Sequence, residues 1–427
     1  MTVSAATSEA GSRPNFVILL ADDLGYGDLG CYGHPQVRTP HLDGLAASGL
    51  RFGDFHSSGA VCSPTRAGLL TGRYQQRAGI PGVILADPKA GLRHHGLQPG
   101  EATLAGLLRS AGYATGICGK WHLGYEPRYN PVRHGFDVFR GYVSGNVDYF
   151  SHLDGAGIPD WWDGDRLAPE DGYTTHLITR HAVRFIEAHA QEPFCLYVAH
   201  EAVHSPYQGP GDGPVRTADG QKLPERRDRV SAYREMTEAM DAGVGEVLAA
   251  LARHGLEERT LVFFFSDNGA TRIGSNGVLR GGKGTLWEGG HRIPAIARWP
   301  GRIAAGSRCD VPTICLDLLP TLLGLAGAST PPRPLDGIDL RRLLFGTGVP
   351  TSRRIFWGHG RDRAVRDGAW KLLLRDGAPP ALFDLESDLT ESNDLAAREP
   401  ARVARLREAV AAWERDVTRD AMPQPMN

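Results

Sequence analysis

The chain contains 427 residues, and its 47 lysines and arginines are balanced by 49 aspartates and glutamates, which leaves a net charge of −2. This balance provides no basic field that would attract nucleic acid or an anionic membrane, so we expect neither as a partner. No apolar run reaches about 18 residues, and the sequence therefore predicts no membrane-spanning helix. At this length we expect two packed units of unequal size.

The first 14 residues are small and polar, and we expect residues 1–14 to form a flexible terminus. They contain neither the basic start nor the apolar stretch of a signal peptide. As written, the sequence predicts a cytoplasmic protein, or a periplasmic or secreted one if an export signal has been removed. Its six cysteines are scattered without a Cys-x-x-Cys pair, and we expect most of them to be reduced and buried.

Residues 15–21 are almost wholly apolar, as is typical of a strand buried on both faces of a parallel sheet. Asp22 and Asp23 follow at once. Two adjacent carboxylates at the end of a buried strand are unfavourable unless a positive group binds them. An exposed Asp-Asp turn is one interpretation; the favoured one is a hard divalent cation with oxygen ligands.

The segment 61–73 begins with a cysteine at the predicted start of a short helix. Pro64 suits the first helical turn, and Cys62 then lies at the positive end of the helix, where anions bind. Arg66 lies one turn further along the same face. A lone cysteine is more often a small buried apolar residue. The combination here favours a nucleophile that handles anions, while His56, shortly before it, is expected to be structural.

A predicted strand over 113–118 leads into Lys120 and His122. These two side chains alternate along an extended segment, so we expect both to point the same way from the strand end. Surface lysines and histidines are common, but these two follow directly on a buried strand. We therefore regard both as candidate site residues.

Two aromatic segments, 141–152 and 161–162, have the composition of loops. They are expected either to cover an edge of the core or to form a wall that faces a carbohydrate. The next buried strands, 194–199 and 260–266, deliver His204 and the pair Asp267 and Asn268 beyond their ends. Helices are predicted, from apolar spacing and end signals, over 39–48, 101–110, 173–189, 231–254, 312–326 and 400–417.

The glycine-rich segment 279–292 allows the backbone to approach a ligand closely, and Lys283 within it is the candidate anion contact. A mobile loop with a solvated lysine is the alternative. A further strand is predicted over 294–299. After residue 349 the pattern changes to short strands at 353–357, 369–374 and 381–384, separated by Asp-Gly and Pro turns, which indicates an antiparallel meander.

We therefore predict an α/β fold with a large, mostly parallel sheet flanked by helices on both faces, and a smaller C-terminal antiparallel sheet with a packing helix. The expected units are a catalytic domain over 15–348 and a subdomain over 349–427. Ligands of such sheets bind beyond the carboxyl ends of the strands. The carboxylates and the amide gathered there suit Ca²⁺ or Mg²⁺ better than Zn²⁺, and the cations suit a tetrahedral oxyanion.

The pattern Cys-x-Pro-x-Arg followed by Leu-Thr-Gly-Arg within 61–73 resembles the signature of the type I, formylglycine-dependent sulfatases of the alkaline phosphatase superfamily. The resemblance extends from Asp22 and Asp23 through Gly-Lys-Trp-His-Leu-Gly to Trp-Glu-Gly-Gly and the C-terminal meander. Residues 148–152 and 279–283 are most similar to the arylsulfatase and N-acetylgalactosamine-sulfatase branch.

The resemblance implies a role for each candidate. The implied metal ligands, with calcium the usual ion and magnesium the less expected one, are Asp22, Asp23, Asp267, Asn268 and Cys62 after its oxidation to formylglycine. Arg66, Lys120 and His122 would hold the formylglycine, and His204 and Lys283 the sulfate. The implied partners are a formylglycine-generating enzyme and a sulfated small molecule or saccharide. The missing export signal and the shorter chain depart from the family pattern and affect the compartment and the pocket walls.

The implied reaction is hydrolysis of a sulfate monoester of a carbohydrate or an aryl alcohol. One alternative is a phosphate or phosphonate monoester hydrolase of the same superfamily. Another is a protein that binds sulfated glycans without catalysis. The aromatic segments favour a sulfated sugar over a simple aryl ester.

Overall fold

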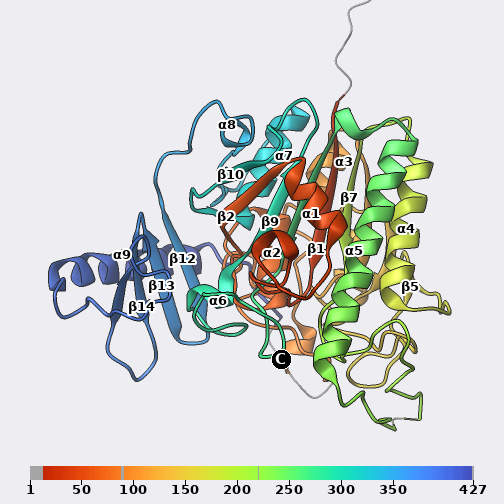
Figure 1. The fold of residues 1–427 in the computed structure, drawn as a ribbon, viewed down its shortest axis with the longest axis horizontal. Helices are drawn as coiled ribbons and strands as arrows, with labels where there is room; N and C mark the ends of the chain where they lie inside the picture. The colour runs from red at the N-terminus through yellow and green to blue at the C-terminus, as the bar shows by residue number, and fades with distance from the viewer. Residues whose placement is uncertain (1–12, 88–90, 220, 426–427) are drawn as a thin grey trace, which may run out of the picture.

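The computed structural model describes residues 13–87, 91–219 and 221–425 (Figure 1). Most of the predicted flexible terminus lies outside these ranges. The main sheet has 11 strands in the order β10-β2-β9-β8-β1-β7-β3-β4-β5-β6, with β11 paired to β2. Its strands are β1 Asn15–Ala21, β2 Leu50–His56, β3 Ala114–Lys120, β4 Val138–Tyr142, β5 Trp162–Asp163, β6 Arg166–Leu167, β7 Phe194–Ala199, β8 Thr260–Ser266, β9 Arg292–Arg298, β10 Ser307–Cys309 and β11 Thr313–Ile314.

The centre of the main sheet is parallel, as predicted. β1 lies between β7 and β8 and is parallel to both, and β3 is parallel to β7 and β4. β1, β7 and β8 are apolar along almost their whole length because helices cover both faces. β9 is antiparallel to both of its neighbours, β2 and β8.

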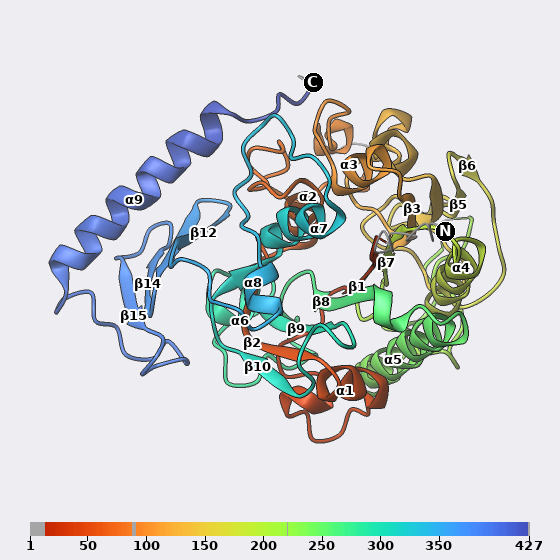
Figure 2. The same ribbon diagram turned by 90° about the horizontal axis from the view of Figure 1, so that it is seen from above.

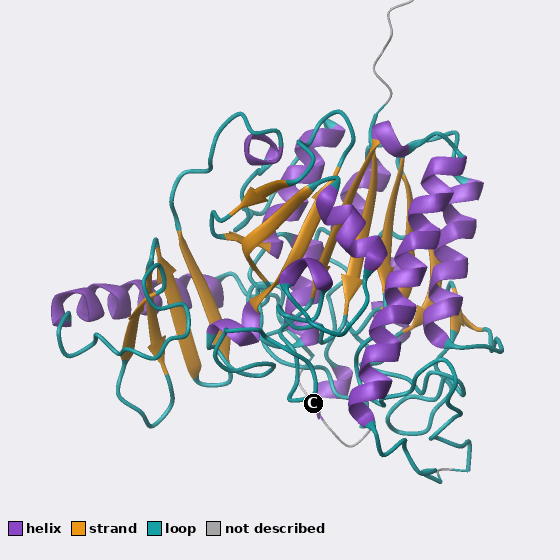
Figure 3. Ribbon diagram, in the orientation of Figure 1, coloured by secondary structure: helices purple, strands orange, loops and turns teal. Residues whose placement is uncertain are grey.

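The helices form a layer on each face of the main sheet (Figures 2 and 3). One apolar core packs α2, α3 and α7 against one face, and a second packs α1, α4 and α5 against the other. The helices are α1 Pro40–Ala47, α2 Cys62–Thr71, α3 Leu104–Ser110, α4 Thr174–Ala188, α5 Arg229–Arg253, α6 Glu288–His291, α7 Leu318–Ala326, α8 Arg341–Leu344 and α9 Pro400–Arg419. Within the described ranges, none of the helices has the length and apolar character needed to span a bilayer.

The C-terminal sheet is an antiparallel meander of β12 Arg354–His359, β13 Asp362–Asp367, β14 Trp370–Leu374 and β15 Ala381–Asp384. It lies to one side of the main sheet, with α9 along its outer face (Figure 2). Leu406 and Val410 of α9 pack on Val365 and Leu372 of the sheet. This arrangement matches the predicted small sheet and packing helix.

Several predicted elements differ from the structure in their bounds, and seven strands were not predicted, namely β2, β4, β5, β6, β10, β11 and β13. β2 contains Gly53 and Asp54 and has an irregular register between Phe52 and Phe55, so it lacks an apolar run. β13 carries charged residues at both ends, so its sequence did not indicate a strand of the meander.

Two predicted helices begin later than expected. The helix expected from residue 101 starts at Leu104, because the hydroxyl of Thr103 accepts the N–H of Gly106 at 3.1 Å and caps it. The helix expected from residue 312 is preceded by β11 and a short 3₁₀ turn and starts only at Leu318.

Candidate functional site

The candidate site lies where the carboxyl ends of β1 and β8 meet the start of α2. Ala21 of β1 pairs with Ser266 of β8 in parallel register, so Asp22 and Asp267 leave the sheet side by side. Asp23 and Asn268 follow them, and all four side chains are buried. Parallel strands thus bring together carboxylates that are more than 240 residues apart in the sequence.

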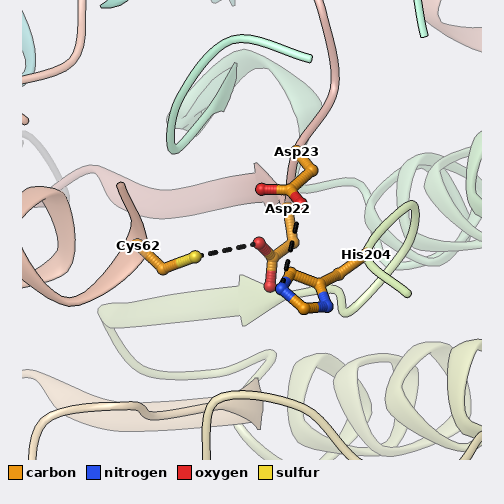
Figure 4. Close-up of side chains that lie close together, drawn as sticks. All are labelled: Asp22, Asp23, Cys62 and His204. Carbon is orange, nitrogen blue, oxygen red and sulfur yellow. Dashed lines mark hydrogen bonds and ion pairs between the residues drawn. The ribbon is translucent and has the colours of Figure 1, made fainter. Parts of the chain in front are cut away.

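Cys62 is the first residue of α2, and its thiol points at the aspartates (Figure 4). The distance from Cys62 Sγ to Asp22 Oδ1 is 3.5 Å. Burial, followed by the charge of Asp22, raises the pKa of the thiol far above its usual value. The unmodified thiol is therefore held protonated, in spite of its place at a helix N-terminus.

Two cations balance the buried carboxylates. Arg66 Nη2 lies 2.9 Å from Asp267 Oδ2 and 3.4 Å from Asp22 Oδ2, and Lys120 Nζ also contacts Asp22 Oδ2. Burial and the neighbouring charge of Asp22 raise the pKa of Asp267 to about 6, against the lowering effect of Arg66 and Lys120. Arg66 is itself fully buried and also donates to the backbone oxygen of Lys120 at 3.1 Å.

A second group of side chains surrounds Asp23. Lys283 Nζ lies 2.6 Å from Oδ1 and 2.8 Å from Oδ2 of this carboxylate, and His204 Nε2 lies 3.8 Å from Oδ2. Burial alone would raise the pKa of Asp23, but Lys283 and His204 outweigh it and the pKa lies well below its usual value. Burial and the charge of Lys283 lower the pKa of His204 to about 3.

His122 lies at the site in a backbone conformation that the sequence did not predict. The extended conformation ends at Lys120, and His122 adopts a φ of 57°, so the simple alternation expected for these two residues is wrong. Its Nε2 lies 2.9 Å from the carbonyl oxygen of Ile84 and must donate to it, which leaves Nδ1 unprotonated in the neutral ring. This Nδ1 is buried and has no hydrogen-bond partner among the described residues.

A cavity of about 280 Å³ joins these side chains. Cys62, His122, His204 and Lys283 line it together with a largely apolar wall. That wall and its rim are formed by Val83, Ile84, Leu85, Ala86, Tyr125, Gly145, Asn146 and Gly155. Gly145 and Asn146 lie in the segment 141–152, which the sequence offered as a possible wall, whereas the apolar run at 83–86 was not predicted. A larger cavity of about 520 Å³ lies beside the C-terminal sheet and contains none of the candidate residues.

The tryptophans do not form a carbohydrate-facing wall, although Gly145 and Asn146 of the segment 141–152 line the cavity. Trp161 is buried and packs on His152 at a ring-centroid distance of 4.7 Å, and Trp162 donates from Nε1 to Asp160 at 2.6 Å. Neither tryptophan lines the 280 Å³ cavity. Tyr149, in the other aromatic segment, is also fully buried. These aromatic residues cover the edge of the core, which was the alternative interpretation.

The side chains around Asp22 and Asp23 fit a divalent cation. Each of Asp22, Asp23, Cys62 and His204 offers one donor atom, and the four atoms lie within 4.8 Å of one another. Asn268 turns its Nδ2 toward Asp23 Oδ1 at 2.8 Å, while its Oδ1 is buried with no hydrogen-bond partner within the described part of the chain. An unpartnered amide oxygen beside two carboxylates is a donor set for a hard cation.

Two of the predicted site residues differ from the placement that the resemblance implies. Asp267 is not in the group of four, because its Oδ1 accepts the N–H of Asp23 at 3.2 Å and its Oδ2 pairs with Arg66. His204, which was predicted to contact the sulfate, is in that group.

Comparison with known proteins identifies the family. The sulfatase family model matches residues 14–328. Arylsulfatase A of Bos taurus is 37% identical over 93% of this chain and 82% of its own length, and N-acetylgalactosamine-6-sulfatase of Mus musculus is 38% identical over 86% of this chain and 72% of its own. The solved structure of Ps i-CgsB in complex with k-i-k-neocarrahexaose superposes with a TM-score of 0.87 at 30% identity, over 97% of this chain and 96% of that one. The chain therefore belongs to the sulfatase family and is a hydrolase of sulfate esters.

Proposed function

We propose that the chain hydrolyses a sulfate monoester of a carbohydrate or aryl alcohol, with a formylglycine made from Cys62 as the nucleophile and a bound divalent cation, calcium in preference to magnesium. The observation that carries this proposal is the position of Cys62. Its Sγ lies 3.5 Å from Asp22 and shares one cavity with His122, His204 and Lys283. A nucleophile, buried carboxylates and several cations thus converge on a space that a sulfate group can enter.

The cationic residues address the main obstacle to the reaction. The oxygens of a sulfate ester repel an incoming anion, so the site must neutralise charge as well as supply a nucleophile. Arg66 and Lys120 stabilise negative charge next to residue 62, and Lys283 and His204 would contact the sulfate from the other side. Asp22, Asp23, Asp267 and Asn268 would hold the cation, which supplies further charge stabilisation when bound.

Oxidation of Cys62 to formylglycine would supply a hydrated aldehyde, which has one hydroxyl to attack sulfur and a second through which sulfate can leave. Asp267 would assist removal of the proton from the attacking hydroxyl. Lys283 is the favoured donor of a proton to the departing alcohol oxygen, because the low pKa of His204, the other candidate, leaves its ring neutral. His122 would accept the proton of the second hydroxyl, and its unpartnered Nδ1 supports that role.

The modification itself constrains when the partner enzyme acts. Every residue of α2, from Cys62 to Thr71, is buried. A formylglycine-generating enzyme would have to bind the segment around Cys62 before the chain folds. Folded, unmodified protein is therefore expected to resist conversion.

Both proposed substrate classes find support. The relatives include proteins named arylsulfatase A and N-acetylgalactosamine-6-sulfatase, and one neighbouring structure contains k-i-k-neocarrahexaose. The cavity offers apolar contacts from Val83, Ile84 and Leu85 and a polar contact from Asn146. An aromatic ring or the apolar face of a sugar would fit against the first set.

A direct comparison of substrates tests the reaction class. Protein whose residue 62 is formylglycine should hydrolyse p-nitrophenyl sulfate faster than p-nitrophenyl phosphate. The reverse order would favour the phosphate or phosphonate monoester hydrolase. Binding of sulfated saccharides without hydrolysis, in fully modified protein, would favour the non-catalytic binder. A panel of sulfated mono- and disaccharides then identifies the alcohol.

A further inference from the structure

The loop that carries Lys283 lies against the segment that carries Cys62. It spans residues 279–287, between β8 and α6. The N–H of Gly284, next to Lys283, donates to the backbone oxygen of Ala60 at 2.8 Å. The conformation of this loop therefore sets the position of the lysine relative to residue 62.

Both ends of the Lys283 loop are held by a single residue that follows the C-terminal sheet. The backbone oxygen of Glu391 accepts a hydrogen bond from Arg280 Nη1 at 2.6 Å, at the start of the loop. Its Oε2 accepts the N–H of Glu288 at 2.7 Å, just after the loop ends. Glu391 is fully buried. None of these hydrogen bonds joins it to a residue that lines the 280 Å³ cavity.

A buried lysine balances the charge of this anchor. Lys371 Nζ, from β14, lies 2.8 Å from Glu391 Oε1, 2.9 Å from Glu288 Oε1 and 3.2 Å from His291 Nε2. This ammonium offsets the charge of one of the two buried carboxylates, and Arg292 Nη1, which lies 3.4 Å from Glu288 Oε2, supplies a second positive charge. His56, Glu288 and His291 have the spacing of metal ligands, but the ammonium contacts the donor atoms of Glu288 and His291, and we assign no metal to them.

Aromatic and cation–π contacts of Trp287 also hold the Lys283 loop. The guanidinium of Arg280 lies 3.8 Å from the ring centroid of Trp287, within the loop. From the C-terminal sheet, Phe383 packs on Trp287 at 5.5 Å between ring centroids, and the guanidinium of Arg375 lies 5.3 Å from the same ring. Residues of the C-terminal sheet thus hold the loop in place, although they do not belong to the main sheet.

The backbone of Glu391 has an unusual conformation, which the surrounding contacts must hold in place. Its φ is 50°, in the left-handed region that a residue with a Cβ seldom adopts. Asp388 holds the turn, because its Oδ2 accepts the N–H groups of Ser392 and Asn393, each at 2.8 Å. Such a conformation persists only where its surroundings determine it.

We infer that Glu391 is a positioning residue, which fixes the Lys283 loop from the C-terminal sheet and thereby sets the affinity of the site for the sulfate group. The inference rests on the proposed role of Lys283 at the sulfate. It assigns the C-terminal sheet a part in substrate binding that requires no contact with the substrate.

A double-mutant cycle tests this coupling. Glu391→Gln leaves the backbone contact with Arg280 in place and removes the charge that pairs with Lys371. In the formylglycine-containing enzyme it should reduce kcat/KM by about tenfold to about 100-fold, mostly through a raised KM, because a displaced Lys283 loses its alignment. In a Lys283→Ala background the same substitution should change kcat/KM less than about twofold, since the group being positioned is gone. Equal effects in the two backgrounds would overturn the inference.

Hydrogen exchange provides a readout that needs no substrate. Glu391→Gln should increase amide exchange in residues 279–287. The matched control is Asp317→Asn, because Asp317 is also a buried carboxylate that accepts backbone N–H groups and pairs with a cation, Arg353, from just before the C-terminal sheet. The control should leave exchange in the loop unchanged. Unchanged exchange in the Glu391→Gln variant would contradict the inference.

The two proposals can fail separately. If modified wild-type protein hydrolyses no sulfate ester, the proposed function fails, while the exchange experiment still decides whether Glu391 holds the loop. If Glu391→Gln does not fold, Arg280→Lys removes the guanidinium at the same anchor from the loop side. It should raise exchange in the loop, and an unchanged loop would again count against the inference.

Discussion

Lys283 and Asp23 are 260 residues apart in the sequence, yet the ammonium of the lysine lies 2.6 Å and 2.8 Å from the two oxygens of the carboxylate. This pair joins the glycine-rich loop before α6 to the end of β1. It also places a cation at the cavity that contains Cys62. The contact depends on chain segments that no local pattern relates.

Replacing Lys283 tests its proposed contact with the sulfate. Lys283→Ala should reduce kcat/KM on p-nitrophenyl sulfate by about 10²-fold to 10³-fold, as for other donors that stabilise a developing negative charge. Lys222→Ala is the control, because Lys222 is an exposed lysine outside the cavity. Steady-state kinetics on both variants make the comparison. Equal activity in Lys283→Ala and Lys222→Ala would remove Lys283 from the mechanism.

Removal of the cation should abolish activity reversibly. Asp22 and Asp23 are buried carboxylates beside the unpartnered oxygen of Asn268, so a chelator should inactivate the enzyme and lower its thermal stability. Added Ca²⁺ should restore both properties more fully than Mg²⁺, as measured by activity and melting temperature. Asn268→Ala should weaken the restoration by Ca²⁺. Full activity in protein shown by elemental analysis to be free of metal would exclude the proposed cation.

Glu201 should give the stability an unusual dependence on pH. The carboxyl is fully buried, its Oε1 accepts the N–H of Val147 at 2.7 Å, and burial raises its pKa well above the ordinary value of 4.5. Above pH 4.5 the folded state keeps a proton that the unfolded state releases. The free energy of unfolding should therefore fall by about 1.4 kcal/mol per pH unit until the folded pKa is reached.

The Glu201→Gln variant supplies the comparison, because its amide resembles the protonated carboxyl and does not titrate. Urea denaturation between pH 5 and 8 should show the variant gaining stability over the wild type as the pH rises. Parallel stability curves for the two proteins would show that Glu201 is ionised in the folded state.

Trp161 should matter for stability and not for substrate binding. It is buried against His152 and does not line the cavity. Trp161→Ala should reduce the free energy of unfolding by about 3 to 5 kcal/mol, while the KM of the folded enzyme for sulfated saccharides stays the same. Denaturation and kinetics at a temperature where the variant is folded measure the two effects. A raised KM with unchanged stability would instead support the interpretation that Trp161 belongs to a wall that faces a carbohydrate.

The central strands were predictable because a short, wholly apolar run indicates a strand that is buried on both faces. Residues 15–21 and 260–266 are buried on both faces, and the polar residues after them had to meet at one edge of the sheet. β2 was not predictable, because Gly53 and Asp54 interrupt its apolar pattern and its burial comes from neighbouring strands. β12, β14 and β15 of the C-terminal meander were predictable for another reason, since Asp-Gly and Pro turns bound them.

The site was predictable to a similar extent. The residues at strand ends could be assigned from their position, and the others from the resemblance to sulfatases. The wall at 83–86 could not, because an apolar loop residue resembles a core residue until its neighbours are known. The role of Glu391 depends on contacts with Arg280 and Glu288 that are more than 100 residues away, and nothing in the local sequence indicates them.

The most direct test measures the state of residue 62 and the turnover in the same samples. Protein produced with and without a formylglycine-generating enzyme can be mixed to give a series of modified fractions, each quantified by mass spectrometry of the peptide that contains residue 62. We predict that the rate on p-nitrophenyl sulfate rises in proportion to the modified fraction and extrapolates to zero where every residue 62 is cysteine. Near-normal turnover in protein whose Cys62 is unmodified would contradict the account.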